Sequence, residues 1–486
     1  MDEQSLKDKT VSGVGWSAAD AFLDKGVTFI VGLVLARLLT PEEYGLIGIV
    51  TIFTTVMLGV VDSGFSNALI RKKDVSDEDY STLFYFNLIV SVVMFALLFI
   101  GALWIATFFE RPELVSLVRV MGFLLIFQAF SIVQNTILSR KIDFKTKTRA
   151  SVISAFISGI IGIVLAFWGF GVWSLVAQQL SRQLFYSGLL WLYNKWWPKL
   201  LMSVESIRYM WGFGWKLLVS GLLDNIWKEI YQAIVGKFYS PDALGQYTRS
   251  SQYASLFSSN LTVIVQRVSY PVLSQVQGDN ERMVNAYRRV IKVTMFVTAI
   301  TMISLAAVSE PLIYCLIGPQ WNQAASFLPF ICLSMSLYPL HALNLNMLQV
   351  QGRTDIFLYI EIVKKIIAIA PISLGIFVSI YWMLIGSIIT GIISFFLNSY
   401  YTGKKLGYSS WMQLKDIAPS FGIALLVASS VYFFKYLPIS NWVILPIQVI
   451  VGVLCFYYVC EKSNLDEYKE VKSIALQYLS KIRSKK

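Results

Sequence analysis

Long apolar stretches are the feature that most restricts what this chain of 486 residues can fold into. Fourteen runs are each long enough to cross a bilayer as a helix, which takes about 20 residues. We expect these spans at residues 13–38, 45–70, 82–108, 113–138, 150–168, 171–193, 210–235, 245–272, 290–317, 327–350, 355–378, 381–402, 416–436 and 440–460. The pattern predicts an all-α polytopic membrane protein with about 14 transmembrane helices.

The composition excludes several other classes of protein. Hydrophobic residues make up 56% of the chain and charged residues only 14%, whereas soluble proteins contain about 25% charged residues. A soluble domain, a disordered chain and a disulfide-stapled secreted module are therefore excluded. We expect no cleaved signal peptide, because the first residues are polar and the first span carries Asp20 and Asp24.

Basic residues are distributed unevenly between the loops. The N-terminus, every second loop and the C-terminal tail together hold 28 Lys and Arg residues, whereas the other loops hold 4. Because positive loops stay in the cytoplasm, both termini are predicted to be cytoplasmic in the inner or plasma membrane. The basic residues form no single groove, so we expect no nucleic-acid partner.

The sequence contains a duplication with a shift of 200 residues. Its matching positions, given as pairs, are Leu23 and Leu223, Asp24 and Asp224, Arg37 and Lys237, Thr40 and Ser240, Pro41 and Pro241, and Gly45 and Gly245. Six spans lie in each repeat, and this even number means that both copies enter the membrane in the same direction. The duplication predicts two six-helix bundles related by an axis along the membrane normal.

This organisation predicts four segments. They are an N-terminal six-helix bundle (1–195), a C-terminal six-helix bundle (196–402), two additional transmembrane helices (403–460) and a cytoplasmic amphipathic tail (461–486). Two similar bundles that face each other can open a central cleft to either side of the membrane by rocking. The repeat therefore favours a carrier that works by alternating access.

Four local motifs resemble those of bacterial polysaccharide exporters. They are Ala36-Arg37-Leu38-Leu39-Thr40-Pro41-Glu42-Glu43-Tyr44-Gly45, Asp62-Ser63-Gly64-Phe65-Ser66-Asn67-Ala68-Leu69-Ile70, Leu138-Ser139-Arg140-Lys141-Ile142-Asp143-Phe144 and Phe170-Gly171-Val172-Trp173-Ser174-Leu175-Val176. In order and spacing they are similar to Wzx-type lipid-linked oligosaccharide flippases of the lipopolysaccharide and teichuronic acid branch. That branch belongs to the multidrug, oligosaccharidyl-lipid and polysaccharide exporter superfamily.

The resemblance implies a transporter that moves an undecaprenyl-diphosphate-linked oligosaccharide across the cytoplasmic membrane for surface polysaccharide biosynthesis. It implies membrane lipids, a polysaccharide polymerase and glycosyltransferases as partners. The sequence has no phosphate-binding loop and no zinc motif. We therefore expect no cofactor, no metal site and no enzymatic activity.

Four basic residues lie well inside the expected spans, where charge is costly and indicates function. They are Lys25, Arg182, Lys216 and Lys228. Since arginine offers a fork that matches phosphate oxygens, these cations are candidates for a cleft that binds the diphosphate and sugar. The alternative for Arg182 is a structural pair with an acidic residue of the bundle.

Acidic residues accompany these cations in the first and seventh spans. They are Asp20, Asp24, Asp224 and Glu229, and we consider them for the binding of a coupling proton or cation. Asp224 and Lys228 are four residues apart, which suits an ion pair on one helix face. The alternative is therefore that these charges neutralise one another.

Two other functions stay open at this stage. A multidrug or organic-cation antiporter of the same superfamily would favour an acidic cavity, whereas four cations favour an anion. A membrane glycan polymerase or ligase would need a large outer loop with catalytic groups. The longest outer loop expected here, residues 310–326, contains a single ionisable side chain that could serve as a catalytic group, Glu310.

Overall fold

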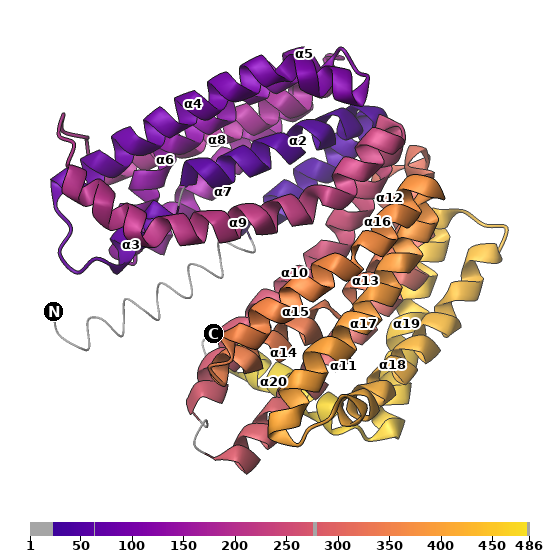
Figure 1. Ribbon diagram of the computed structural model, residues 1–486. Helices are drawn as coiled ribbons and strands as arrows, with labels where there is room; N and C mark the ends of the chain where they lie inside the picture. The colour runs from indigo at the N-terminus through magenta and orange to yellow at the C-terminus, as the bar shows by residue number, and fades with distance from the viewer. Residues whose placement is uncertain (1–22, 63, 276–278, 484–486) are drawn as a thin grey trace. The chain divides into compact units, whose positions relative to one another are not determined.

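The computed structural model describes residues 23–62, 64–275 and 279–483. All regular secondary structure in these ranges is helical (Figure 1), which confirms the all-α class. The chain divides into two compact units, Met1–Gly245 and Gln246–Lys486.

The first unit contains an initial helical segment, residues 23–38, and eight further helices. These are α2 (Pro41–Asp62), α3 (Phe65–Arg71), α4 (Asp77–Phe109), α5 (Leu114–Met121), α6 (Phe123–Arg140), α7 (Phe144–Phe167), α8 (Val172–Asn194) and α9 (Val204–Phe238). Helix α8 packs against α6 and α7, while α9 packs against α2, α3 and α4.

The second unit is formed by the remaining helices. These are α10 (Pro241–Gln275), which begins in the first unit, α11 (Asn280–Ala307), α12 (Ser309–Ile317), η1 (Pro319–Trp321), α13 (Asn322–Met335), α14 (Tyr338–Val350), α15 (Thr354–Ile367), α16 (Ile369–Phe377), α17 (Ile380–Leu406), α18 (Ser410–Tyr432), η2 (Phe433–Tyr436), α19 (Asn441–Ser463) and α20 (Asp466–Arg483). Helix α11 packs along α18, and α13 lies between α11 and α17.

Each expected span falls on one helix or on two consecutive helices, apart from the start of the first span, which lies outside the described residues. Within the described residues, nine helical stretches are long and apolar enough to cross a membrane, so the protein is a multi-pass membrane protein. The count of fourteen is not confirmed. Five expected spans are not among the nine: those on residues 23–38, on α8, on α9, on α10, and on α15 with α16.

The duplication is visible in the helix boundaries. The segment of residues 23–38 ends at Leu38 and α9 ends at Phe238, while the next helices begin at Pro41 and Pro241. A shift of 200 residues therefore superposes both breaks. Proline suits the first position of a helix because its missing N–H group would have no partner there.

The two copies of this break contact each other within the first unit. A Cβ atom on Gly45 would lie 1.7 Å from the carbonyl oxygen of Pro241, and one on Gly245 would lie 1.9 Å from that of Pro41. No side chain fits at such distances, so the sequence requires glycine at both positions. The contact is reciprocal, because the glycine of each copy lies against the proline of the other.

Helix α9 belongs to the first compact unit, because both of its ends are bound there. Near its start, Ser206 Oγ donates a hydrogen bond of 2.7 Å to Oδ1 of Asp79, a residue of α4 that is 2% exposed. Near its end, Lys237 Nζ donates to Glu110 Oε1 over 2.9 Å, and this hydrogen bond lowers the pKa of the Glu110 carboxyl. The division of the membrane spans at residue 195, and the other expected segment limits, stay predictions.

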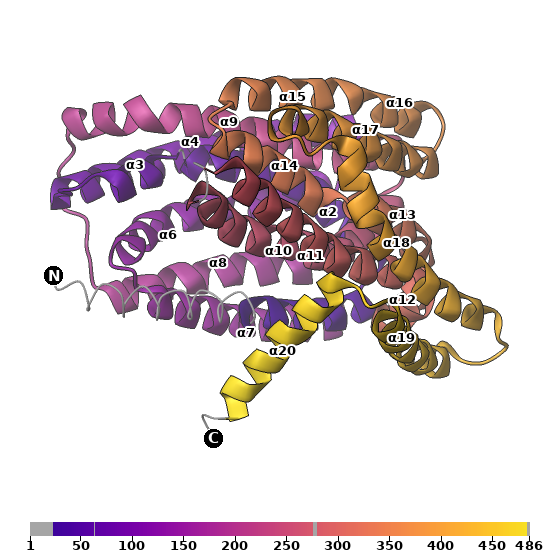
Figure 2. The same cartoon turned by 90° about the horizontal axis from the view of Figure 1, so that it is seen from below.

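The C-terminal helix α20 is attached to the second unit by its first turns. Lys292 Nζ lies 2.6 Å from Glu467 Oε1, and Arg289 donates a hydrogen bond of 2.8 Å to Glu470. Tyr468 is buried against Phe296 of α11. Figure 2 shows the later turns of α20 pointing away from the other helices of this unit. Docking of the first turns was not expected from sequence, and the cytoplasmic location of this tail stays a prediction.

Candidate functional site

A charged cluster in the first unit joins three helices. Arg182 of α8 places its Nη2 atom 2.8 Å from both carboxylate oxygens of Asp24, which lies on the segment of residues 23–38. The Arg182 Nη1 atom donates to the Thr28 hydroxyl over 3.0 Å, and the Ser151 hydroxyl of α7 donates to Asp24 Oδ1 over 2.9 Å. The alternative of a structural pair for Arg182 therefore has an identified acidic partner.

Small residues allow these three helices to approach one another. A Cβ atom on Gly159 of α7 would lie 2.4 Å from the side chain of Val31, and one on Gly162 would lie 3.0 Å from that of Gln178 on α8. Because α7 presents glycine at these positions, the helix of Asp24 and the helix of Arg182 both pack closely against it. Close packing brings the short Asp24 side chain within reach of the guanidinium.

The ion pair is only partly buried. The Arg182 side chain is 33% exposed and that of Asp24 is 19% exposed. Nη2 of the guanidinium binds the carboxylate and Nη1 binds Thr28, while the side chain as a whole stays partly accessible. A guanidinium binds phosphate oxygens by the same fork geometry with which it binds a carboxylate.

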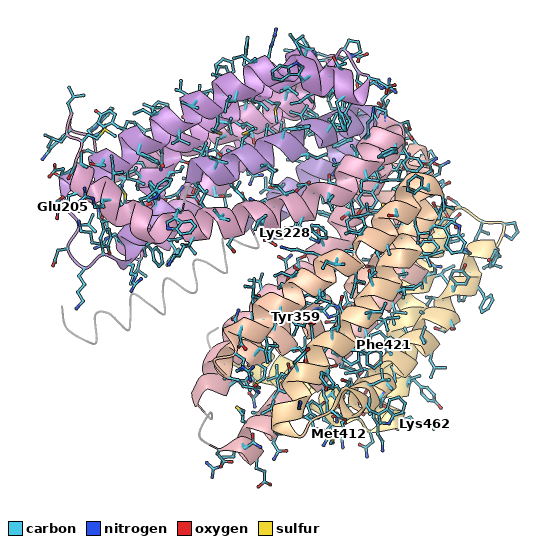
Figure 3. All side chains as sticks on the ribbon, in the orientation of Figure 1. Glu205, Lys228, Tyr359, Met412, Phe421 and Lys462 are labelled. Atoms are coloured by element: carbon cyan, nitrogen blue, oxygen red, sulfur yellow. The ribbon has the colours of Figure 1, made fainter. Side chains whose placement is uncertain are left out.

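The candidate residues of the seventh span lie on α9. Lys228 Nζ lies 2.6 Å from Asp224 Oδ2, the pairing that their spacing of four residues predicts. Both side chains are largely exposed, at 59% and 63%. Lys216 is exposed beside the ring of Trp215, and Glu229 accepts a hydrogen bond of 2.8 Å from Gln232. Figure 3 labels Lys228 on α9, far along the helix from Glu205 at its start.

The structure unites these predicted residues in two pairs, Asp24 with Arg182 and Asp224 with Lys228. Lys25 is exposed and lies next to Asp24 in the chain. Asp20 lies outside the described residues. No group of three metal-ligating side chains occurs in the described part of the chain.

Sequence reasoning missed a polar face on α10. Gln246 is buried and binds both η1 and α13, since its Nε2 donates to Gln320 O over 2.8 Å and its Oε1 accepts from Ala324 N over 2.9 Å. Ser250 donates to Ala324 O over 2.7 Å, and Ser258 donates to Met335 O over 2.8 Å. The signal was the unusual density of Ser and Gln along residues 246–266, which an apolar span does not need.

The sequence matches a known protein family over most of its first two thirds. A family model described as polysaccharide biosynthesis protein matches residues 34–326, which is more than half of the chain. The chain belongs to this family. Its motifs around Arg37, Asp62, Arg140 and Trp173 lie within the matched range.

Two named proteins are similar to the chain over most of its length. The chain is 25% identical over 368 residues to the succinoglycan biosynthesis transport protein ExoT of Rhizobium meliloti, which covers 76% of this chain and 74% of the relative. It is 24% identical over 486 residues to the teichuronic acid biosynthesis protein TuaB of Bacillus subtilis, which covers 97% of this chain and 99% of the relative.

Solved structures show the same fold at low sequence identity. The lipid II flippase MurJ, in an inward closed conformation, matches with a TM-score of 0.72 at 16% identity, over 92% of this chain and 97% of its own. An inward-facing multidrug resistance transporter of the MATE family matches with a TM-score of 0.62 at 16% identity, over 80% of this chain and 99% of its own. The chain therefore shares the fold of these two solved structures.

Proposed function

We propose that this protein is a flippase that moves an undecaprenyl-diphosphate-linked oligosaccharide across the cytoplasmic membrane for the biosynthesis of a surface polysaccharide. The names of two relatives support the proposal, since one is a transport protein of succinoglycan biosynthesis and the other serves teichuronic acid biosynthesis. The fold supports it as well, because a lipid II flippase shares it.

The observation that carries the proposal is the partly exposed pair of Arg182 and Asp24. A diphosphate carries more negative charge than one carboxylate and can compete with Asp24 for the guanidinium. Once displaced, the Asp24 carboxylate needs a proton or a cation, because an uncompensated charge inside a membrane protein is costly. Substrate binding and cation binding are then coupled through a single exchange.

The other candidate residues extend this exchange along the transport path. Lys25, Lys216 and Lys228 supply further positive charge for the diphosphate and the sugar. The acids Asp20, Asp224 and Glu229 are the further candidates for the coupling ion. The Asp224–Lys228 pair is more exposed than the Asp24–Arg182 pair, so an anionic ligand separates it at lower cost.

The proposal includes alternating access of two helical bundles, a location in the inner or plasma membrane and cytoplasmic termini. Glycosyltransferases that supply the substrate and a polymerase that consumes it are the partners this chemistry requires. The protein acts as a transporter and not as an enzyme, with the energy supplied by an ion gradient or by removal of the substrate on the far side.

Transport of organic cations by antiport is the second function that the fold supports, because a multidrug resistance transporter of the MATE family has the same fold. The two functions require opposite charge at the site. An antiporter for cations would use Asp24 as the ligand and would need Arg182 only to hold it. A flippase for a diphosphate uses Arg182 as the ligand, so the two proposals predict different effects of substitution at these residues.

Reconstitution tests the proposal directly. The full chain is placed in proteoliposomes with a polyprenyl-diphosphate-linked disaccharide that carries a label, and the labelled lipid accessible from each side is measured over time. We expect exchange between leaflets that is faster than in liposomes with an Arg182→Gln variant. Equal rates for the two proteins, or transport of organic cations in place of the lipid, would overturn the proposal.

A further inference from the structure

The second unit contains a cavity of about 670 Å³ whose lining includes none of the residues assigned to transport. It lies between α11, α12, α13, α18 and η2. A cavity of this size suits a small molecule or part of a larger one. It lies wholly within one compact unit.

Two side chains of opposite charge line this cavity. Lys435 lies in η2, where its Nζ donates to the Tyr432 hydroxyl over 2.8 Å and sits 4.2 Å from the centre of the same ring. The ammonium is thereby held in a fixed position at the cavity. Glu310 lines the cavity from the start of α12, and in the described part of the chain it forms no salt bridge.

The rest of the lining is mostly apolar. It includes Ile303 of α11, Leu333 of α13 and Leu425 of α18. Leu425 is 54% exposed and Leu333 is 39% exposed, so this surface offers apolar area to a ligand. From Leu425 to Tyr432 the cavity follows α18 for roughly 10 Å.

The cavity reaches the end of a hydrophobic span. The span of residues 410–436 ends one residue after Lys435, whereas Leu425 lies within its body. Lys435 therefore lies at the end of the span, where lipid headgroups are expected, and Leu425 lies in its body, where acyl chains are expected. This order of polarity matches that of a membrane lipid.

We propose that the cavity binds one zwitterionic phospholipid of the surrounding bilayer. The lipid phosphate contacts Lys435, and a primary ammonium of the ethanolamine type contacts Glu310. One acyl chain lies along the apolar lining. Opposite charges in one cavity select this headgroup over one that carries only a negative charge, because a purely anionic lipid would leave Glu310 next to uncompensated negative charge.

Native mass spectrometry of the full chain from mixed micelles tests the headgroup. Phosphatidylethanolamine and phosphatidylglycerol are added at equal concentration, and the fraction of protein that retains each lipid is measured. We expect Glu310→Gln to lower the preference for phosphatidylethanolamine by about tenfold and Lys435→Gln to weaken the binding of both lipids. Glu205→Gln and Lys462→Gln are matched controls, because both residues are exposed and lie outside the cavity.

A second pair of measurements tests the apolar part. Soluble glycerophosphoethanolamine carries the same headgroup without acyl chains, and we expect it to compete poorly. Ser429→Trp places a large ring in the cavity from an exposed position, and we expect it to abolish lipid retention while the thermal midpoint without lipid stays unchanged. Equal preference in Glu310→Gln and wild type, or full competition by the soluble headgroup, would overturn the proposal.

Discussion

Arg182 and Asp24 are 158 residues apart in the chain, yet the Nη2 atom of Arg182 lies 2.8 Å from both carboxylate oxygens of Asp24. The pair is partly exposed and has hydroxyl partners in Thr28 and Ser151. A contact of this kind holds two helices together, and under the proposed function it also presents a cation to the diphosphate. The two roles are separable by experiment.

Charge exchange between these two positions separates the roles. Asp24→Arg combined with Arg182→Asp keeps an ion pair but moves the cation to another helix. We expect the exchanged protein to fold with a near-normal thermal midpoint and to lose about 10- to 100-fold in flipping rate. Either single substitution alone should lower the midpoint, because it places like charges together. Normal transport by the exchanged protein would show that the pair only stabilises the fold.

Asp24→Asn is expected to tighten binding of the diphosphate lipid while slowing its transport. The amide leaves the Arg182 guanidinium available to the phosphate, but it cannot take up a proton or cation in the exchange. Binding of the labelled lipid to purified protein and flipping in proteoliposomes measure the two effects separately. Weaker binding by Asp24→Asn would contradict the competition between carboxylate and phosphate.

The reciprocal contact between the repeats predicts that neither Gly45 nor Gly245 can be replaced by alanine without loss of stability. Gly45→Ala and Gly245→Ala each place a methyl group within 2 Å of a proline carbonyl oxygen, so either should cost at least about 2 kcal/mol of stability. Gly101→Ala is the control, because nothing lies within 4 Å of a Cβ atom there. Thermal unfolding monitored in detergent compares the three variants, and similar midpoints for all of them would exclude the close contact.

Asp79 is expected to be the main polar anchor of α9. Its carboxylate accepts hydrogen bonds from Lys72, Ser206 and the backbone of Ser76 while 2% exposed. Asp79→Ala leaves these donors unpaired and should cost about 3 kcal/mol. Asp77→Ala removes the surface pair with Lys199 and should cost less than about 1 kcal/mol. Equal losses in thermal stability would refute the difference.

The ion pair between a half-exposed arginine of α11 and a buried aspartate of α18 should hold these two helices together. Arg288 donates hydrogen bonds of 2.5 and 2.6 Å to Asp416, which also accepts from the Tyr408 hydroxyl over 2.7 Å. We expect Asp416→Ala to increase hydrogen exchange in α18 and in the loop of residues 407–409, which contains Tyr408. Asp355→Ala, at an exposed pair with Arg353, should leave exchange in α18 unchanged. Unaltered exchange in Asp416→Ala would show that apolar packing alone fixes α18.

Several properties of this protein follow from sequence patterns alone. Apolar runs identify the helices because the requirement for about 20 residues holds in any bilayer. The duplication identifies equivalent breaks before Pro41 and Pro241 because it needs only a comparison of the chain with itself. The Asp224–Lys228 pair was predictable too, since a spacing of four residues fixes neighbours on any helix.

Tertiary structure alone decided which partner each equivalent acid has. Asp24 and Asp224 occupy matching positions, but Asp24 binds an arginine of α8, whereas Asp224 binds a lysine of its own helix. The position 200 residues after Arg182 is Trp382, which offers no charge. The Asp24 contact depends on glycines of α7 that let three helices approach, and such packing between distant segments leaves no regular spacing in the sequence.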